Sequence, residues 1–186
     1  MVVLDATALG LLVHPDSRPP ADPSTGQPVE FARERYVFLA EELQRQGETI
    51  AIPTPALSEL LVLAGDAGPA LLAAVHKSAR FKIVEFDVRA AVEVAAMTRE
   101  AERAGDKRAG SFEPYQKIKV DRQIVAIARV TGVNVIYSDD GNLRSFAERL
   151  GMTVVRSWEL PLPPATAPDL LSFIDAQSAN PRDTGE

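Results

Sequence analysis

The sequence of 186 residues contains no cysteine. This absence excludes disulfide bonds, thiolate zinc sites and enzymes with a cysteine nucleophile, and it fits a reducing compartment. The chain reaches a carboxylate at Asp5 without a basic segment or a long apolar core before it, so we expect no secretory signal. No apolar run approaches the length of a membrane span, so we expect a soluble, cytoplasmic protein without a membrane partner.

Positive charge is also scarce, because 20 lysines and arginines face 26 acidic residues and leave a net charge of −6. Proteins contact phosphate through lysine and arginine, so this balance argues at first sight against a nucleic-acid binder. Net charge is a sum over the whole surface, however, whereas binding is local. A clustered set of basic residues would answer the objection.

Short apolar segments alternate along the chain with segments of helical periodicity. We expect strands at residues 2–4, 49–52, 81–86, 133–137 and 152–155, and helices at residues 31–46, 56–64, 68–78, 87–104, 113–131 and 142–150. Alternation of this kind predicts an α/β fold, a three-layer α/β/α domain with a central parallel sheet of four to five strands. Ligands of such sheets bind at the carboxyl ends of the strands.

Two proline-rich segments interrupt this pattern. Residues 14–29 hold five of the fourteen prolines, and we interpret them as a loop insertion. Prolines and small residues return from residue 161 onward. We therefore expect one domain over residues 1–160 and a loosely attached tail over residues 161–186, with a short helix near residues 169–176.

Two expected strands end in acidic residues at the same edge of the sheet. Asp5 follows the first strand, and Asp139 and Asp140 follow the fourth. An aspartate at such a position is more often a helix cap or a turn former than a functional group. A second observation is needed before a site is inferred.

The helical acids Glu59 and Asp121 supply that observation. Glu59 is the only charged residue in an apolar helix, and Asp121 lies on the apolar stripe of its own helix. A buried carboxylate requires a salt bridge, a raised pKa or a cation. Several carboxylates at one point repel one another unless a cation lies between them, and oxygen ligands favour Mg²⁺ or Mn²⁺ over zinc.

In this order, the motifs resemble those of the PIN-domain nucleases, and most of all the VapC-like ribonuclease toxins of toxin–antitoxin pairs. The resemblance runs from residue 1 to about residue 157 and rests on Val-Val-Leu-Asp5-Ala-Thr7, Pro-Ala-Leu-Ser-Glu59-Leu-Leu, Asp121-Arg-Gln-Ile-Val-Ala and Ile-Tyr-Ser138-Asp-Asp140-Gly-Asn142-Leu. Each motif is weak alone, whereas the ordered set is specific.

The resemblance implies a catalytic metal site formed by Asp5, Glu59, Asp121 and Asp140, with Mg²⁺ or Mn²⁺ as cofactor. Asp140 is favoured over Asp139, because the family pattern has a hydroxyl residue, any residue and then Asp. Many relatives have a second Asp where this chain has Asn142, which could still coordinate through its oxygen. Two hydroxyl positions of the family, which orient the acids or a water, correspond to Thr7 and Ser138.

The implied reaction is hydrolysis of RNA phosphodiester bonds by an endoribonuclease. The implied partners are an RNA substrate, a cognate antitoxin and a second copy in a homodimer. Basic residues around the site could bind the RNA, or they could be an ordinary solvated surface; they are Lys107, Arg108, Lys117, Lys119 and Arg122. Two alternatives remain open, a PIN-fold protein that binds RNA or a partner without cleavage and a housekeeping RNA-processing nuclease.

Overall fold

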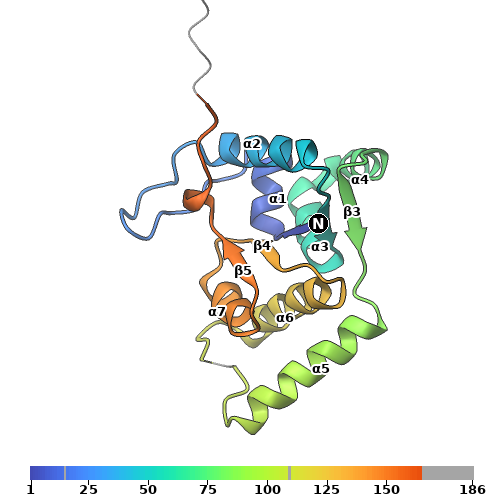
Figure 1. Cartoon of the computed structure of the whole chain (residues 1–186), viewed down its shortest axis with the longest axis vertical. Coiled ribbons are helices and arrows are strands. Elements are labelled where there is room, and N and C mark those ends of the chain that lie inside the picture. Colours follow the sequence, from blue (N-terminus) through green and yellow to red (C-terminus); the bar gives the residue numbers. More distant parts are fainter. Residues whose placement is uncertain (15, 109, 165–186) are drawn as a thin grey trace, which may run out of the picture.

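The computed structural model describes residues 1–14, 16–108 and 110–164. Five parallel strands form one sheet in the order β3-β2-β1-β4-β5 (Figure 1). They are β1 (Val2–Leu4), β2 (Ile50–Pro53), β3 (Phe81–Val84), β4 (Val135–Tyr137) and β5 (Thr153–Val155). Helices flank this sheet, so the predicted α/β fold with a parallel central sheet is confirmed.

In the described part of the chain, seven α-helices connect or follow the strands. They are α1 (Ala6–Val13), α2 (Ala32–Arg45), α3 (Thr54–Ala64), α4 (Gly68–Lys77), α5 (Val88–Arg103), α6 (Tyr115–Val130) and α7 (Gly141–Arg149), with 3-10 turns at Gly65–Ala67 and Ser157–Glu159. Six of these helices match the predicted ones to within a few residues. The first, α1, was not predicted, because its eight residues are apolar nearly all round and show no amphipathic stripe.

The central strand β1 decides where the site lies. Val3 and Leu4 are fully buried, and they pair with Ala51 of β2 and Tyr137 of β4. The backbone N–H of Asp5 donates to the carbonyl of Tyr137 at 3.1 Å, which continues the pairing past the strand ends. The acids that follow β1 and β4 are therefore adjacent at the carboxyl edge of the sheet.

The crossover between β2 and β3 corrects two expectations. Its residues Thr54–Lys77 are long and apolar enough to cross a membrane by length and composition, so the prediction that no such run exists was wrong. The run is interrupted by a 3-10 turn at Gly65–Ala67, and both strands that flank it lie in the sheet. Nor is α3 a buried helix, because Val62 is 82% and Leu63 64% exposed.

The proline-rich segment before α2 has no helix or strand in its described part, as predicted. It holds an isolated antiparallel bridge between Ala21 and Pro28 and a turn in which the Asp22 carboxylate accepts from the Ser24 N–H at 2.8 Å. The helix predicted near residues 169–176 lies outside the described residues. The division into a domain over residues 1–160 and a tail over residues 161–186 stays a prediction.

Candidate functional site

A cavity of about 110 Å³ opens where β1 and β4 end. Side chains from four separate segments of the chain reach it, namely Asp5, Thr7, Glu59, Lys117, Asp121 and Asp140. The fold thus brings together the four acids and one of the two hydroxyl residues that the sequence singled out. Their role as metal ligands stays a prediction.

Asp5 and Asp140 occupy equivalent positions, each between a strand and the helix that follows it. The Oδ1 atom of Asp5 accepts from the Ala8 N–H at 2.8 Å and caps α1. The Oδ1 atom of Asp140 accepts from the N–H groups of Asn142 and Leu143 at 2.7 and 3.0 Å and caps α7. The capping interpretation of these acids is therefore right, and capping fixes the two carboxylates at the cavity wall instead of excluding them from it.

Ser138 joins these two positions from beneath. Its side chain is fully buried, its hydroxyl accepts from the Asp140 N–H at 3.1 Å, and it hydrogen-bonds the Asp5 carboxylate. Asp139 takes no part, because its Oδ1 accepts from the Ser157 N–H at 2.7 Å and its Oδ2 from the Ser157 hydroxyl. The alternation of side chains along an extended segment thus directs Asp140 into the cavity and Asp139 away from it, as the sequence favoured.

Asp121 is the acid whose environment is hardest to explain structurally. It is 8% exposed, and its Oδ2 atom is buried without a hydrogen-bond partner. Burial, with the charge of Asp140 nearby, raises the pKa of Asp121 to about 7. Burial also raises the pKa of Asp5 to about 6, against hydrogen bonds that lower it. The charge of Lys117 lowers the pKa of Asp121 but does not offset the desolvation.

Glu59 differs from this pattern. It lies on an exposed part of α3 at the rim of the cavity, so the expectation of a buried carboxylate in a buried helix was wrong. Partial desolvation still raises its pKa, while the charge of Lys117 lowers it. Glu59 can therefore move toward a bound ion at little cost, because solvent surrounds much of its side chain.

Lys117 supplies the positive charge nearest to the acids. Its Nζ lies 2.6 Å from the Oδ2 of Asp140 and 3.5 Å from Glu113. This ion pair and two backbone hydrogen bonds hold the pKa of Asp140 below its usual value although burial raises it. The sequence had marked Lys117 as an RNA-binding residue, and the structure places it within the acidic site.

The donor set fits a hard divalent cation, because it consists of carboxylate and hydroxyl oxygens and includes the unpartnered Oδ2 of Asp121. Across residues 1–14, 16–108 and 110–164, no three His, Asp or Glu side chains converge closely enough to hold an ion. Of the four acids, only Asp140 forms an ion pair within the described residues, and like charges repel one another when no cation lies between them.

The other predicted RNA-binding residues differ in exposure. Arg122 was expected on an exposed helix face but is 1% exposed, so this expectation was wrong. Lys107 and Lys119 lie over the ring of Tyr115, with Nζ 4.7 and 5.1 Å from its centre. Arg108 donates to the carbonyl of Glu113 at 3.5 Å. These positive charges gather on the loop before α6 and on its first turns.

Asn142, the position where the chain departs from the family pattern, lies outside the acidic cavity. Its side chain lines a neighbouring cavity together with Asp121. The interpretation of Asn142 as an additional metal ligand therefore finds no support in its position.

The comparisons with known proteins agree with the fold. A family model described as PIN domain matches residues 29–149, a range that includes Glu59, Asp121 and Asp140 but begins after Asp5. Two solved structures cover 84% of this chain: VapBC2 from Rickettsia felis bound to a promoter DNA fragment (17% identity, TM-score 0.51, 98% of that chain) and DNA-bound VapBC from Salmonella typhimurium (19% identity, TM-score 0.50, 97% of that chain). The search of curated proteins gave no match.

Proposed function

Because the chain belongs to the PIN-domain family, whose members include nucleases, we propose that it is a metal-dependent endoribonuclease that hydrolyses RNA phosphodiester bonds. The observation that carries the proposal is the cavity that Asp5, Glu59, Asp121 and Asp140 line together, with the buried, unpartnered Oδ2 of Asp121 among its oxygens. Mg²⁺ or Mn²⁺ is the cofactor that this oxygen donor set would accept.

The acids would hold the cation, which would polarise the scissile phosphate and activate the attacking water. Asp121 and Asp5 would bind it as carboxylates, so both must lose the proton that burial favours. Lys117 would leave Asp140 as the ion binds and could then pair with a phosphate oxygen, since its side chain is 44% exposed. The exposed hydroxyl of Thr7 at the cavity rim would orient substrate or water.

We also propose that the protein is the toxin of a toxin–antitoxin pair and acts in the cytoplasm. The similarity in fold to chains from two VapBC structures supports this role. The exposed apolar side chains Val62 and Leu63 on α3 support a partner surface, and a second copy in a homodimer is the occupant we propose. A neighbouring gene for a small DNA-binding protein would favour the toxin over a housekeeping nuclease.

Incubation of the purified protein with a mixed RNA pool tests the central proposal. We expect cleavage with Mg²⁺ or Mn²⁺, none in EDTA, and none by Asp121→Asn. A parallel incubation with single-stranded DNA of the same length range tests the choice of RNA. If wild type and variant bound RNA equally but neither cut it with either metal, the protein would be the non-cleaving PIN-fold binder instead.

A further inference from the structure

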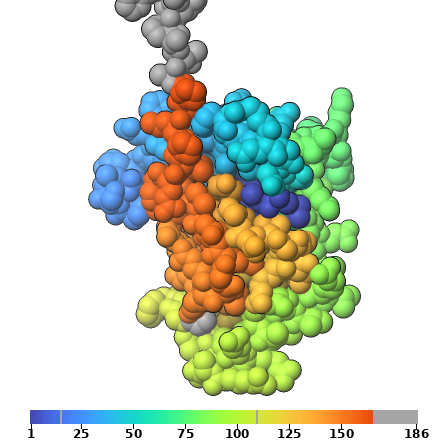
Figure 2. Space-filling view, viewed as in Figure 1, coloured from blue at the N-terminus to red at the C-terminus, as the bar shows by residue number. Residues whose placement is uncertain are grey.

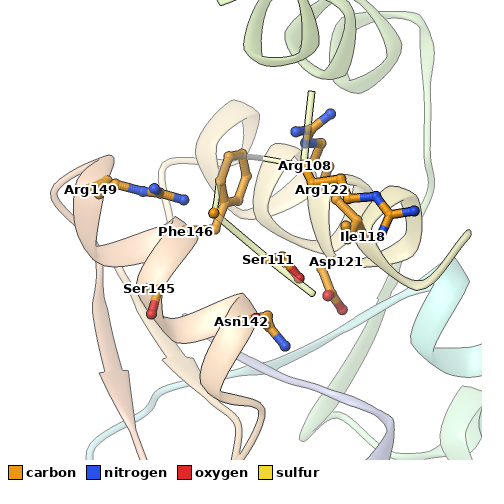
Figure 3. A pocket seen from close by; sticks show the side chains of 10 residues that line it. Arg108, Ser111, Ile118, Asp121, Arg122, Asn142, Ser145, Phe146 and Arg149 are labelled. Atoms are coloured by element: carbon orange, nitrogen blue, oxygen red, sulfur yellow. The ribbon is translucent and has the colours of Figure 1, made fainter. Parts of the chain in front are cut away.

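A second cavity, of about 80 Å³, adjoins the acidic site and shares Asp121 with it (Figure 3). Hydrogen-bond donors dominate its wall, which includes Arg108, Arg122, Arg149, Ser111, Ser145 and Asn142. Arginine donates in a fork that matches phosphate oxygens, and hydroxyl and amide groups can complete the shell. Apart from the Asp121 carboxylate, which it shares with the acidic site, the polar groups of this arginine pocket are those of an anion site.

Arg122 is the buried member of the pocket. Its guanidinium donates to the Thr98 hydroxyl at 3.1 Å and to the Lys107 carbonyl at 2.7 Å, while its Nε has no hydrogen-bond partner. Among the described residues, no carboxylate forms an ion pair with it. A buried cation without a counter-anion is costly, and a bound anion nearby would offset that cost.

The aromatic ring of Phe146 organises the arginines. Figure 3 shows this ring between Arg149 and Arg122, and their guanidinium carbons lie 5.9 and 5.6 Å from its centre. Stacking on a ring face restrains an arginine side chain without using its donors. A guanidinium group therefore lies near the ring on each side of the pocket.

Asn142 suits this pocket better than an aspartate would. Its side chain reaches the wall from the first turn of α7 and is neutral, with an amide that can donate to an anion. A carboxylate at the same place would add a second negative charge to the pocket, beside Asp121. The departure from the family pattern at Asn142 thus has an electrostatic explanation.

A larger cavity, of about 420 Å³, continues from the arginine pocket and shares Gly110, Phe146 and Arg149 with it. Its wall is mostly apolar, with Met97 and Leu150 among its residues. In Figure 2 the segment that follows α5 lies against the α7 region in this part of the molecule. A phosphate in the arginine pocket would therefore find adjacent room for a sugar and a base, which free phosphate does not need.

We propose that the arginine pocket holds the phosphate of the RNA nucleotide next to the scissile bond. This proposal rests on the proposed function, because it takes the acidic site to be the place of cleavage. Asp121 lines both cavities, so a strand bound at one would lie next to the other.

The test measures binding of a fluorescent pool of short random RNAs in EDTA, where cleavage does not interfere. Arg149→Gln removes a charge from an exposed side chain of the pocket, and Arg99→Gln removes the same charge from an exposed position on α5 that lines neither cavity. We expect Arg149→Gln to bind RNA about tenfold more weakly than the control. The slope of log affinity against log salt should fall by about 0.7, the value for one lost phosphate contact to a single strand.

Asn142→Asp separates the phosphate subsite from a metal-ligand role. A subsite predicts weaker RNA binding and unchanged Mn²⁺ affinity, whereas tighter Mn²⁺ binding with unchanged RNA binding would overturn the proposal. If Arg149→Gln and Arg99→Gln bound RNA with equal affinity while the wild type still cut RNA, the phosphate subsite would be refuted and the proposed nuclease function would stand. A wild type that neither binds nor cuts RNA would refute the proposed function as well. If Arg149→Gln weakened the binding of inorganic phosphate but not the binding of RNA, the phosphate subsite would also be refuted.

Discussion

Replacing Asp121 by Asn should stabilise the metal-free protein above neutral pH. In the unfolded chain this carboxyl ionises at its ordinary pKa of 3.8, whereas burial raises the pKa in the folded protein to about 7. Between these values the folded protein binds more protons than the unfolded chain, so its stability falls as the pH rises. Asparagine has a similar shape and no charge to desolvate, so the variant avoids this loss.

The size of the effect follows from the shift. Three pKa units correspond to about 4 kcal/mol, and water that enters the open cavity reduces this to about 1–3 kcal/mol. We expect wild type and Asp121→Asn to be similar near pH 4 and the variant to be more stable by that amount at pH 8. The gap should open between about pH 4 and pH 7, the interval between the two pKa values.

Urea unfolding in EDTA at a series of pH values measures this gap. Adding Mn²⁺ at pH 8 should reverse it, because an ion at one hundred times its dissociation constant stabilises the folded wild type by about 2.7 kcal/mol. The variant Glu34→Gln, at an exposed position, is the control for the loss of one negative charge. A stability difference for Asp121→Asn that stays the same from pH 4 to pH 8 would refute the reasoning.

Three further results are expected. Asp139→Asn should lower the free energy of unfolding by about 1–3 kcal/mol, because it weakens the charged hydrogen bonds to Ser157. An unchanged free energy of unfolding in chemical denaturation would contradict this expectation. Lys117→Met should raise Mn²⁺ affinity, because the ion no longer competes with the ammonium for Asp140; weaker binding in calorimetry would argue against it. Val62→Glu should shift the protein from dimer to monomer in light scattering, and an intact dimer would place the interface elsewhere.

The fold was predictable because its signals are local. Short apolar runs separated by helical periodicity identify a parallel sheet, and the register of β1 against β4 then brings Asp5 next to Asp140. The choice between Asp139 and Asp140 was also accessible, because side chains alternate along an extended segment. Capping and site formation turned out to be compatible, since each aspartate has two oxygens and capping uses one.

Burial was much less predictable than position along the chain. An apolar sequence does not tell whether a helix is covered, so Glu59 was expected inside and lies at an open rim. Arg122 shows the converse, because its long side chain reaches under the surface to Thr98 and the carbonyl of Lys107, partners that are distant in sequence. The arginine pocket depends on such contacts, and no spacing in the sequence indicates it.

Mn²⁺ binding measured by calorimetry tests most directly whether Asp5, Asp121 and Asp140, with Glu59 at the rim, hold a divalent cation. Asp139→Asn is the matched control, because it removes the same charge one residue away from Asp140 and outside the cavity. We expect three variants to lose most of their Mn²⁺ affinity, namely Asp5→Asn, Asp121→Asn and Asp140→Asn. The control Asp139→Asn, checked for folding by circular dichroism, should retain its Mn²⁺ affinity. Equal Mn²⁺ affinity in all four variants and the wild type would contradict the predicted metal site.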